Sequence, residues 1–553
     1  MKKWNLLYQD KSLSLKNEEI VSILLENRNI KTKKEKESFL NPNFRQVTLD
    51  SVRIDKNNLK KAIERIKEAI KNKEKIIVFG DYDVDGICGS AILWETLSSL
   101  KANCLPYIPS RFEEGYGLSV KGINKVLSQD PDLKLIITVD NGIVASEAVD
   151  YANKKGVDVI VTDHHVRPEN LKLPKAYTIV HTTLLCGAGV AYMLSQEMKD
   201  KKSNLKSYDN HLELVALATI ADLVPLRQGN RIFVYYGLQA LQKTKRPGLL
   251  ELFRESRIEK ENIGVYEIGH IIAPRLNAMG RIGSAMDSLR LICTRNNERA
   301  KILANSLGKT NLQRQELTID TLNHALHGAK KNLLNNLIFI ADKSYQEGII
   351  GLVAGRLVEE YYLPSIVISK GKVYSKASAR SVFGFNIVEF LREASDLLVD
   401  VGGHPMAAGF TVETKKLEEL EKFLYKKASK LLNKDHLERK LNIDLNLPED
   451  LISLDLYSAI QKLSPFGMAN PEPLFLTENL NVADIKTVGK DGKHLRLGLK
   501  SEKGKYFESI AFGIGEKNSL VIGDKVSVAY TLSLNEWNGN KKLQLKIKDI
   551  KKN

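Results

Sequence analysis

Short apolar runs alternate with amphipathic segments through the first half of the chain. Residues 75–79, 133–139, 157–162 and 176–180 are nearly continuous apolar runs of strand length, whereas the apolar residues of 59–70 recur at helical spacing. Strands that are apolar at every position are covered on both faces, and alternating strands and helices favour parallel pairing. The pattern therefore predicts an α/β fold with a doubly wound parallel sheet. The helices predicted between the strands are 89–100, 145–155 and 189–198.

The periodicity changes along the rest of the chain and predicts five segments. Residues 1–50 are polar and favour small helices, and 51–285 hold the doubly wound domain. A stretch almost without turn residues, 286–333, predicts a long connecting helix. Residues 334–435 repeat the strand and helix alternation in a smaller α/β domain. Residues 440–553 contain short strands between Gly, Asp and Asn turns, which is typical of a small antiparallel barrel.

Composition adds a charge argument. The formal net charge is +16 and the isoelectric point is near 9.3. A chain this basic is expected to meet a polyanion, although Lys-Lys runs such as Lys541-Lys542 are equally typical of solvated surfaces. Four cysteines without a CxxC pair indicate reduced, mostly buried thiols of a cytoplasmic protein. No apolar run is long enough to span a membrane, so we expect no membrane partner.

Acids and imidazoles follow three of the predicted strands. They are Asp81, Asp83 and Asp85 after the first, Asp140 after the second, and Asp163, His164 and His165 after the third. The carboxyl ends of parallel strands share one sheet edge, where ligands bind. One acid there is usually a helix cap, and that interpretation suits one or two of these residues. Several carboxylates at one edge would repel one another unless cations neutralised them. A combination of oxygen and imidazole ligands suits Mn²⁺ or Mg²⁺. Paired divalent cations are typical of phosphate ester hydrolysis.

Four motifs then carry a resemblance. GDYDVDG, VDNG, TDHH and the helix ending IADLVP match, in order, the four motifs of the DHH phosphoesterase superfamily. Within it the chain resembles the RecJ family of single-strand-specific 5′→3′ exonucleases over nearly its whole length. The resemblance implies a DHH catalytic domain, a connector helix, a DHHA1 domain and an OB-fold.

The resemblance also implies roles for the strand-end residues. The implied metal ligands are Asp83, Asp85, Asp140, His164 and Asp222, with Asp140 bridging two ions. Asp81 would be a further ligand or a supporting acid, His165 would face the scissile phosphate, and Asp163 would orient the histidines. Many superfamily members carry a ligand histidine two residues before Asp81, and this chain has Phe79 there. That departure would give the first metal a more open or an all-oxygen shell, and it leaves open which metal binds there and whether Asp81 is a ligand.

The sequence GGHPMAAG at 402–409 resembles the signature of the second lobe. A lone histidine in a turn is usually structural, but glycines allow a backbone to approach phosphate closely. By the resemblance, Gly402 and Gly403 would contact the substrate. His404 would bind a phosphoryl oxygen or protonate the leaving group.

Cationic and hydroxyl side chains in similar settings would hold a 5′-terminal phosphate. By the resemblance these are Arg111, Arg281, Arg314, Ser378 and Arg380. Guanidinium groups pair with phosphate in a planar fork. Ordinary salt bridging is the alternative for each, above all for Arg314. Tyr116 would stack on a base or simply pack.

The C-terminal barrel carries much of the excess charge. Residues 481–553 hold 15 Lys or Arg and 8 Asp or Glu, a net charge of +7. Phe507, Phe512 and Trp537 could stack on bases, although core packing suits Phe512, which lies in an apolar run. Basic surfaces with aromatics bind single strands without reading bases.

These observations predict a single-stranded-DNA-specific exonuclease that releases 5′-mononucleotides with two divalent ions, Mn²⁺ or Mg²⁺. The resemblance implies DNA repair and recombination, a helicase and a single-strand-binding protein as partners, and a monomer. Two alternatives stay open, an oligonucleotide or cyclic-dinucleotide phosphodiesterase and a non-enzymatic single-strand-binding scaffold. The choice between DNA and RNA also stays open.

Overall fold

The computed structural model describes residues 2–9, 16–111, 113–167, 171–199, 211–330, 333, 336–515, 519–537 and 540–553. The chain divides into two compact units. One contains Trp4–Ala273 with Lys440–Asn553, and the other contains Met1–Lys3 with Pro274–Arg439. None of the helices in these ranges is both long enough and apolar enough to cross a bilayer.

The first unit contains the predicted parallel sheet. Its strand order is β3-β2-β4-β5-β6, and all four pairings are parallel. The strands are β2 (Lys75–Gly80), β3 (Cys104–Tyr107), β4 (Leu133–Val139), β5 (Asp158–Asp163) and β6 (Thr178–His181). Only β3 was outside the predicted runs, because its four residues include Pro106 and are partly exposed. The reversal of strand order at β2 and β4 places the switch point between these two strands.

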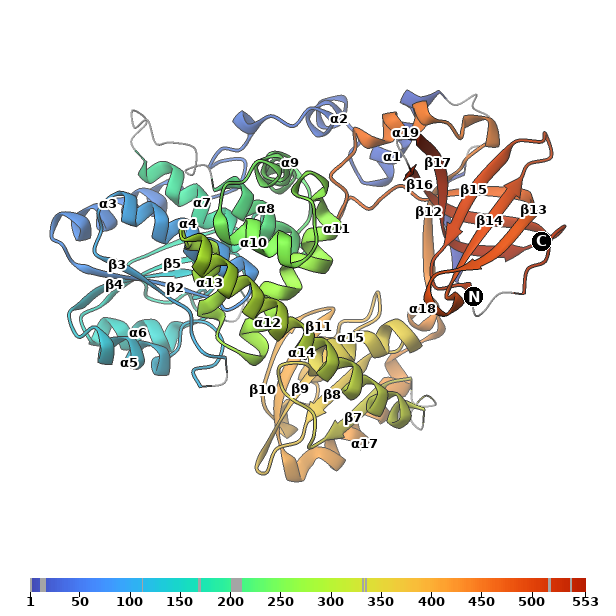
Figure 1. Ribbon diagram of the computed structural model, residues 1–553. Coiled ribbons are helices and arrows are strands. Elements are labelled where there is room, and N and C mark those ends of the chain that lie inside the picture. Colours follow the sequence, from blue (N-terminus) through green and yellow to red (C-terminus); the bar gives the residue numbers. More distant parts are fainter. Residues whose placement is uncertain are drawn as a thin grey trace. The chain divides into compact units, whose positions relative to one another are not determined.

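Helices cover both faces of this sheet (Figure 1). Helices α5 (Val120–Gln129) and α6 (Ser146–Lys154) cover one face, where Phe79 and Val159 lie in their hydrophobic cluster. Each such fully buried side chain contributes about 1.5–3 kcal/mol. The other face is covered by α3 (Lys56–Lys71), α4 (Val84–Ser99) and α7 (Gly187–Met198). The doubly wound arrangement is confirmed.

A buried ionic network ties α4 to the helices that follow the sheet. These helices are α8 (Leu212–Ala221), α9 (Gln228–Gln242) and α10 (Pro247–Glu255). Arg246 donates to both carboxylate oxygens of Glu95, at 2.7 and 2.8 Å, and to Glu213 at 2.6 Å. His211 Nε2 lies 2.8 Å from Glu95 Oε2. Burial alone would raise the pKa of Glu95, but hydrogen bonds from Arg246 and His211 lower this pKa to about 2.

The C-terminal part of this unit forms a closed five-stranded barrel. The order β13-β14-β15-β17-β16 closes through a β13–β16 pairing. Four pairings are antiparallel and β15 with β17 is parallel, so the predicted barrel is confirmed with one parallel pair. The strands are β13 (Phe475–Val488), β14 (His494–Lys500), β15 (Tyr506–Ala511), β16 (Lys525–Trp537) and β17 (Asn540–Lys552), with β12 (Lys440–Asn446) paired to β13.

Two aromatic residues of the barrel differ from expectation. Phe507 is 6% exposed and packs in the barrel core, so it offers no stacking face. Phe512 is 52% exposed, with the Lys546 ammonium 5.6 Å from its ring centroid. Phe507 lies on an inward position of β15, whereas Phe512 follows the last residue of that strand. The side chain of Trp537 lies outside the part that the structure describes.

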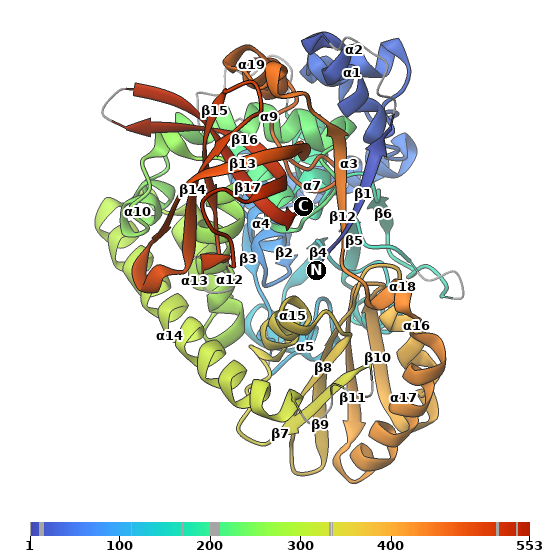
Figure 2. The same cartoon turned by 90° about the vertical axis from the view of Figure 1, so that its right-hand side faces the viewer.

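The start of the chain belongs to the barrel. Residues Lys3–Tyr8 form a strand, β1, next to β12, where helices were expected (Figure 2). Helices α1 (Asn17–Asn27) and α2 (Lys33–Leu40) follow, and α1 packs Ile20 and Leu24 into the barrel core. Buried Arg28 fixes this contact by donating to Asp444 Oδ1 at 3.0 Å.

The second unit is built on a mixed sheet of order β10-β11-β9-β8-β7, in which only β7 with β8 is parallel. The strands are β7 (Ile338–Asp342), β8 (Ser365–Ser369), β9 (Tyr374–Arg380), β10 (Leu398–His404) and β11 (Ala407–Glu413). The expected connector is two helices, because Asn296 caps a new one: α13 (Ala285–Cys293) and α14 (Asn297–Ala329). The other α-helices here are α12 (Ala273–Ile282), which carries Arg281, α15 (Ile350–Tyr361), α16 (Ile387–Arg392), α17 (Leu417–Leu431) and α18 (Lys434–Leu437).

Replacing Glu95 by Gln tests the buried network. We expect Glu95→Gln to lower the free energy of unfolding by about 3 kcal/mol at pH 7, because it leaves Arg246 without its main counter-charge. The folded-state pKa is depressed, so the carboxylate stabilises the fold above its unfolded pKa and the effect disappears as pH falls from about 5 towards 2. Urea unfolding of both proteins at pH 7 and pH 3 measures the difference. An equal difference at both pH values would contradict this role of Glu95.

Candidate metal centre

The first cluster of acids lies where β2 turns into α4. The helix begins at Val84, inside GDYDVDG, rather than at residue 89, because Asp83 caps it. Asp83 Oδ1 accepts from the amides of Asp85 and Gly86 at 2.9 and 3.1 Å. A Cβ on Gly86 would lie 2.5 Å from the Asp81 backbone, so only glycine permits this turn. Asp83 is therefore a helix cap with its second oxygen still available.

Asp85 is held by a different helix. Its two carboxylate oxygens accept from the amides of Gly187 and Ala188, at 2.6 and 2.7 Å, at the start of α7. Partial positive charge at a helix N-terminus stabilises a carboxylate there. Sequence reasoning missed this contact; the small residues of CGAG at 186–189 were the only signal for it.

Asp140 occupies a left-handed backbone conformation, with φ of 62°. Asp and Asn tolerate this region better than other non-glycine residues. Asn141 supports the turn by donating to the Val139 carbonyl at 2.8 Å and accepting from the Leu118 amide at 3.1 Å. A Cβ on Gly187 would lie 2.6 Å from Asp140 Cβ, so the start of α7 leaves room for this carboxylate.

His164 connects the carboxylates from separate segments. Its Nε2 lies 3.1 Å from Asp140, 3.5 Å from Asp222 and 3.6 Å from Asp85. Burial lowers the pKa of His164, so its imidazole is neutral near pH 7. A neutral imidazole nitrogen facing carboxylates is the donor that a divalent cation requires.

His165 has the opposite electrostatic state. Burial alone would lower its pKa, but the hydrogen bond to Asp163 Oδ1 at 2.8 Å raises this pKa to about 9. Its Nε2 lies 3.1 Å from the hydroxyl of Tyr116, a contact not anticipated for that tyrosine. Asp163 also accepts from the amides of His164, His165 and Ile143, at 2.7, 3.1 and 2.9 Å. These bonds hold the pKa of Asp163 below its ordinary range although burial opposes them.

The pKa values of four other carboxylates at this site are raised, as expected where negative charges lie together without enough positive charge to balance them. Burial, followed by repulsion from neighbouring acids, raises the pKa of Asp81, Asp83 and Asp140, and raises that of Asp222 to about 8. Oδ1 of Asp81 and Oδ1 of Asp140 are buried and accept no hydrogen bond from the described residues. Oxygens left in this state are completed by cations.

Ligand atoms fall into three overlapping groups, each within 4.8 Å. They are Asp81 with Asp83 and Asp140, Asp85 with His164 and Asp222, and Asp140 with His164 and His165. Asp140 and His164 each belong to two of these groups, so the three groups form one continuous set of donors. The oxygen and imidazole donors fit Mn²⁺ or Mg²⁺. Phe79 adds no donor, because a phenyl side chain has no ligand atom; its buried ring packs on Tyr107 with centroids 5.2 Å apart.

Most of the expected phosphate-binding residues lie in the second unit. Strand register places Ser378 opposite Gly409 and Gly409 opposite Gly402, with Arg380 opposite Ala407 and Ala407 opposite His404. Paired residues share a face, so Ser378, Arg380 and His404 lie on one face of this sheet. Gly403 has φ of 137° and no room for a Cβ.

The start of α15 approaches the same face. A Cβ on Gly351 would lie 2.9 Å from Ser378 Oγ and 3.0 Å from an Arg380 nitrogen. Arg281 donates to the Gly348 carbonyl at 3.1 Å, just before this helix. Arg281, Ser378 and Arg380 therefore surround one helix start. Arg314 lies on α14 and donates to Asn311 at 2.9 Å, while Arg111 lies in the first unit, 5.4 Å from the Tyr82 ring centroid.

Three family models match the chain. The DHH family N-terminal domain matches residues 75–219, the DHHA1 domain matches 333–433, and the RecJ OB domain matches 443–549. The order of these matches follows the doubly wound sheet, the mixed sheet and the barrel.

Curated relatives and solved structures agree with these matches. The chain is 36% identical to the single-stranded-DNA-specific exonuclease RecJ of Bacillus subtilis, over 89% of this chain and 63% of that protein, so it spans less than two thirds of this relative. It is 32% identical to RecJ of Thermus thermophilus, over 89% of this chain and 71% of that protein. The crystal structure of Thermus thermophilus RecJ in complex with Mn²⁺ matches 100% of this chain and 80% of that chain, with a TM-score of 0.84 and 28% identity. The Mg²⁺ complex matches with a TM-score of 0.76 and 27% identity.

Replacing Asp163 by Asn tests the charge of His165. Without the carboxylate, burial dominates, so we expect the pKa of His165 to fall from about 9 to below its ordinary value near 6.5. An NMR titration of metal-free protein carrying labelled histidine measures this pKa. His327, exposed on α14, is the internal control. A His165 pKa that stays near 9 would show that Asp163 does not hold its charge.

Proposed function

The chain belongs to the RecJ family of single-stranded-DNA-specific exonucleases, and on this basis we propose that it hydrolyses single-stranded DNA from the 5′ end to 5′-mononucleotides. The observation that carries the proposal is the continuous set of three ligand groups joined through Asp140 and His164, in which Asp140 is the proposed shared ligand. The set also includes His165, whose charge is maintained by Asp163. We assign 51–285 to the catalytic DHH domain, 286–333 to the connector, 334–435 to DHHA1 and 440–553 to the OB domain.

In this proposal two divalent cations, Mn²⁺ or Mg²⁺, occupy the centre. Asp83, Asp85, Asp140, His164 and Asp222 are the proposed ligands, and the unpartnered oxygen of Asp81 supports Asp81 as a sixth. Bound together, such ions activate a water molecule and neutralise charge on a phosphodiester. The chain supplies the fixed geometry. Helix amides hold Asp83 and Asp85, and the left-handed turn holds Asp140.

His165 is proposed to contact the scissile phosphate. Its raised pKa keeps a positive charge near pH 7, and a charged imidazole donates from Nε2 to a phosphoryl oxygen. Tyr116 fills that Nε2 contact in the present arrangement and would yield it to the substrate. Asp163 is proposed to orient the two histidines through three hydrogen bonds, from the amides of His164 and His165 and from the His165 ring. A fourth bond, from the Ile143 amide, holds Asp163 itself. His404, on the sheet face with Ser378, is proposed to stabilise the leaving oxygen.

Recognition of the 5′ end is assigned to the cluster at the start of α15. Arg281, Ser378 and Arg380 place two guanidinium groups and a hydroxyl around one helix start, a suitable site for a terminal phosphate. Gly402 and Gly403 let backbone approach the strand there, and Arg111 and Arg314 add charge. This recognition would give the enzyme its 5′→3′ polarity.

The setting of the reaction follows from the family and from charge. We propose a cytoplasmic monomer that acts in DNA repair and recombination, supplied with single strands by a helicase and a single-strand-binding protein. The net charge of +7 over 481–553 favours a long strand over a cyclic dinucleotide as the substrate, because a basic surface binds many phosphates along a strand. The complete set of donors supports catalysis rather than a non-enzymatic scaffold.

Digestion of end-labelled DNA tests the activity. With Mn²⁺ or Mg²⁺, a single strand labelled at its 5′ end should lose its label first as mononucleotide, a 3′-labelled strand should shorten progressively, and duplex should resist. Asp140→Ala should reduce the rate by at least a thousandfold, because it removes the shared ligand. It should leave strand affinity nearly unchanged.

The same assay separates the alternatives. Cleavage of dinucleotides but not of long strands would contradict the exonuclease proposal, and binding without cleavage would indicate a scaffold. Near-normal cleavage by Asp140→Ala would reject the shared-ligand assignment.

Replacing Arg380 by Ala tests end recognition. We expect the loss of kcat/KM to be about tenfold to a hundredfold on a 5′-phosphorylated strand and much smaller on a 5′-hydroxyl strand, because only the former loses a charge-assisted contact. Arg392→Ala is the matched control, since Arg392 is exposed on α16 in the same unit and pairs with Glu389 at 2.6 Å. Equal losses on both strands would reject the role of Arg380.

A further inference from the structure

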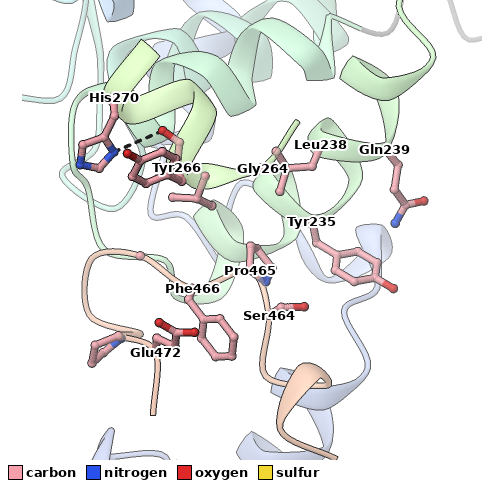
Figure 3. Close-up of a pocket in the computed structure, with 13 residues that line it drawn as sticks. Tyr235, Leu238, Gln239, Gly264, Tyr266, His270, Ser464, Pro465, Phe466 and Glu472 are labelled. Carbon is pink, nitrogen blue, oxygen red and sulfur yellow. Dashed lines mark hydrogen bonds between the residues drawn. The ribbon is translucent and has the colours of Figure 1, made fainter. Parts of the chain in front are cut away.

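A second concave site lies between the doubly wound domain and the barrel segment, within the first unit. It has a volume of about 580 Å³ and is lined mainly by apolar and aromatic side chains (Figure 3). One wall comes from α9 and from the turn through α11 (Val265–Glu267) and the π-helix η3 (Ile268–Ile272). The other wall comes from residues 464–472, which lead from α19 (Leu454–Gln461) into the barrel.

Aromatic faces dominate this pocket. The rings of Tyr266 and His270 stack on each other, with centroids 4.5 Å apart and planes 18° apart. Tyr266 is 63% exposed, so its face is available to a ligand. Phe466 projects from the opposite wall, and Tyr235 lies at the side of the pocket (Figure 3). Flat rings on opposing walls suit a flat, uncharged group.

Hydrogen bonds from Arg231 of α9 hold the wall formed by residues 464–472 in place. Arg231, only 2% exposed, donates to the carbonyls of Leu463 and Ser464 at 2.9 and 2.8 Å. Its guanidinium also stacks on Phe39, 3.7 Å from the ring centroid. Hydrogen bonds to main-chain carbonyls fix the start of the 464–472 segment against α9. The pocket is therefore preformed.

The same segment reaches the polypeptide that follows a proposed metal ligand. The amide of Leu226 donates to the Met468 carbonyl at 2.8 Å, and a Cβ on Gly467 would lie 2.7 Å from Leu226 Cδ1. Leu226 is four residues beyond Asp222, so their Cα atoms are at most about 15 Å apart. The pocket thus lies within a few nucleotides of the proposed centre.

The charges of the lining residues indicate which kind of chemical group the pocket would bind. Among the described residues that line it, Glu472 is the only acid, and none is Lys or Arg. A phosphate would find no counter-charge here, whereas a nucleobase is flat, uncharged and rich in hydrogen-bonding edges. Glu472 and the amide of Gln239 provide acceptors and donors for such edges. The strand's phosphates would instead meet the basic barrel.

We propose that this pocket stacks a base of the single strand during binding, with Tyr266 as its platform. The inference rests on the proposed function and extends it, because it adds a base-binding subsite outside both the metal centre and the 5′-phosphate cluster. Stacking tolerates every base, so the subsite would strengthen binding without selecting sequence.

Binding to metal-free protein tests the subsite apart from cleavage. Affinities are measured by fluorescence anisotropy, in EDTA, for an oligothymidylate and for a strand of equal length made of abasic sites. We expect Tyr266→Ala to weaken binding of the oligothymidylate about tenfold and to leave binding of the abasic strand nearly unchanged. Tyr266→Phe should bind both strands as the wild type does. His270→Ala, which removes the supporting ring, should act in the same direction as Tyr266→Ala.

A control variant, Tyr151→Ala, accompanies these measurements, and two results would overturn the subsite. Tyr151→Ala removes an aromatic ring on α6, beneath Lys155, and should change neither affinity. Wild-type affinity of Tyr266→Ala for both strands, or an equal loss for both, would overturn the subsite. If the wild-type protein binds DNA but never cleaves it, the proposed function fails while the subsite is retained.

Discussion

Repulsion among buried carboxylates is the constraint on which the site depends. Asp81, Asp85 and Asp140, which are buried, and Asp83, which is half-buried, converge at the carboxyl edge of one sheet, where like charges are poorly screened. Two helix starts offset part of this repulsion, since α4 donates amides to Asp83 and α7 donates amides to Asp85. The topology of the sheet is what brings both helix starts to the same edge. The charge that remains is the charge that a pair of cations would balance.

The two histidines show how neighbouring groups of one type acquire different roles. His164 points at three carboxylates yet stays neutral because it is buried, and His165 is charged because Asp163 accepts its Nδ1 proton in a hydrogen bond. Asp163 can do this because it is itself stabilised by main-chain amides. A neutral imidazole, suited to bind a cation, and a charged imidazole, suited to bind phosphate, thus come from adjacent positions of one loop.

Much of this organisation could be predicted from the sequence. Continuous apolar strands predicted the parallel sheet, and acids after those strands predicted a metal site, because both depend on local patterns. The contact between Asp85 and the start of α7 could not be predicted, since it joins residues 102 positions apart through backbone amides that leave no mark on side-chain pattern. The strand at Lys3–Tyr8 was missed for the same reason, because its partner β12 lies more than 400 residues away. The predicted environments of Phe507 and Phe512 were the wrong way round. Side chains alternate between the two sides of β15, so Phe507 faces the core, whereas Phe512, one residue beyond the strand's buried last residue, faces outward.

Strand β1 pairs with β12, and helix α1 packs on the barrel, more than 400 residues further along the chain, which sets an order of events during synthesis. Ribosomes deliver the N-terminus first, yet β1 and the apolar face of α1 find their partners only after β12 and the barrel have emerged. Ile20 and Leu24 therefore stay uncovered while more than 400 further residues are made. A copy cut short before the barrel would leave the apolar face of α1 without its partner. Apolar surface left exposed in this way favours aggregation, so the packing of α1 depends on a segment more than 400 residues away in the sequence.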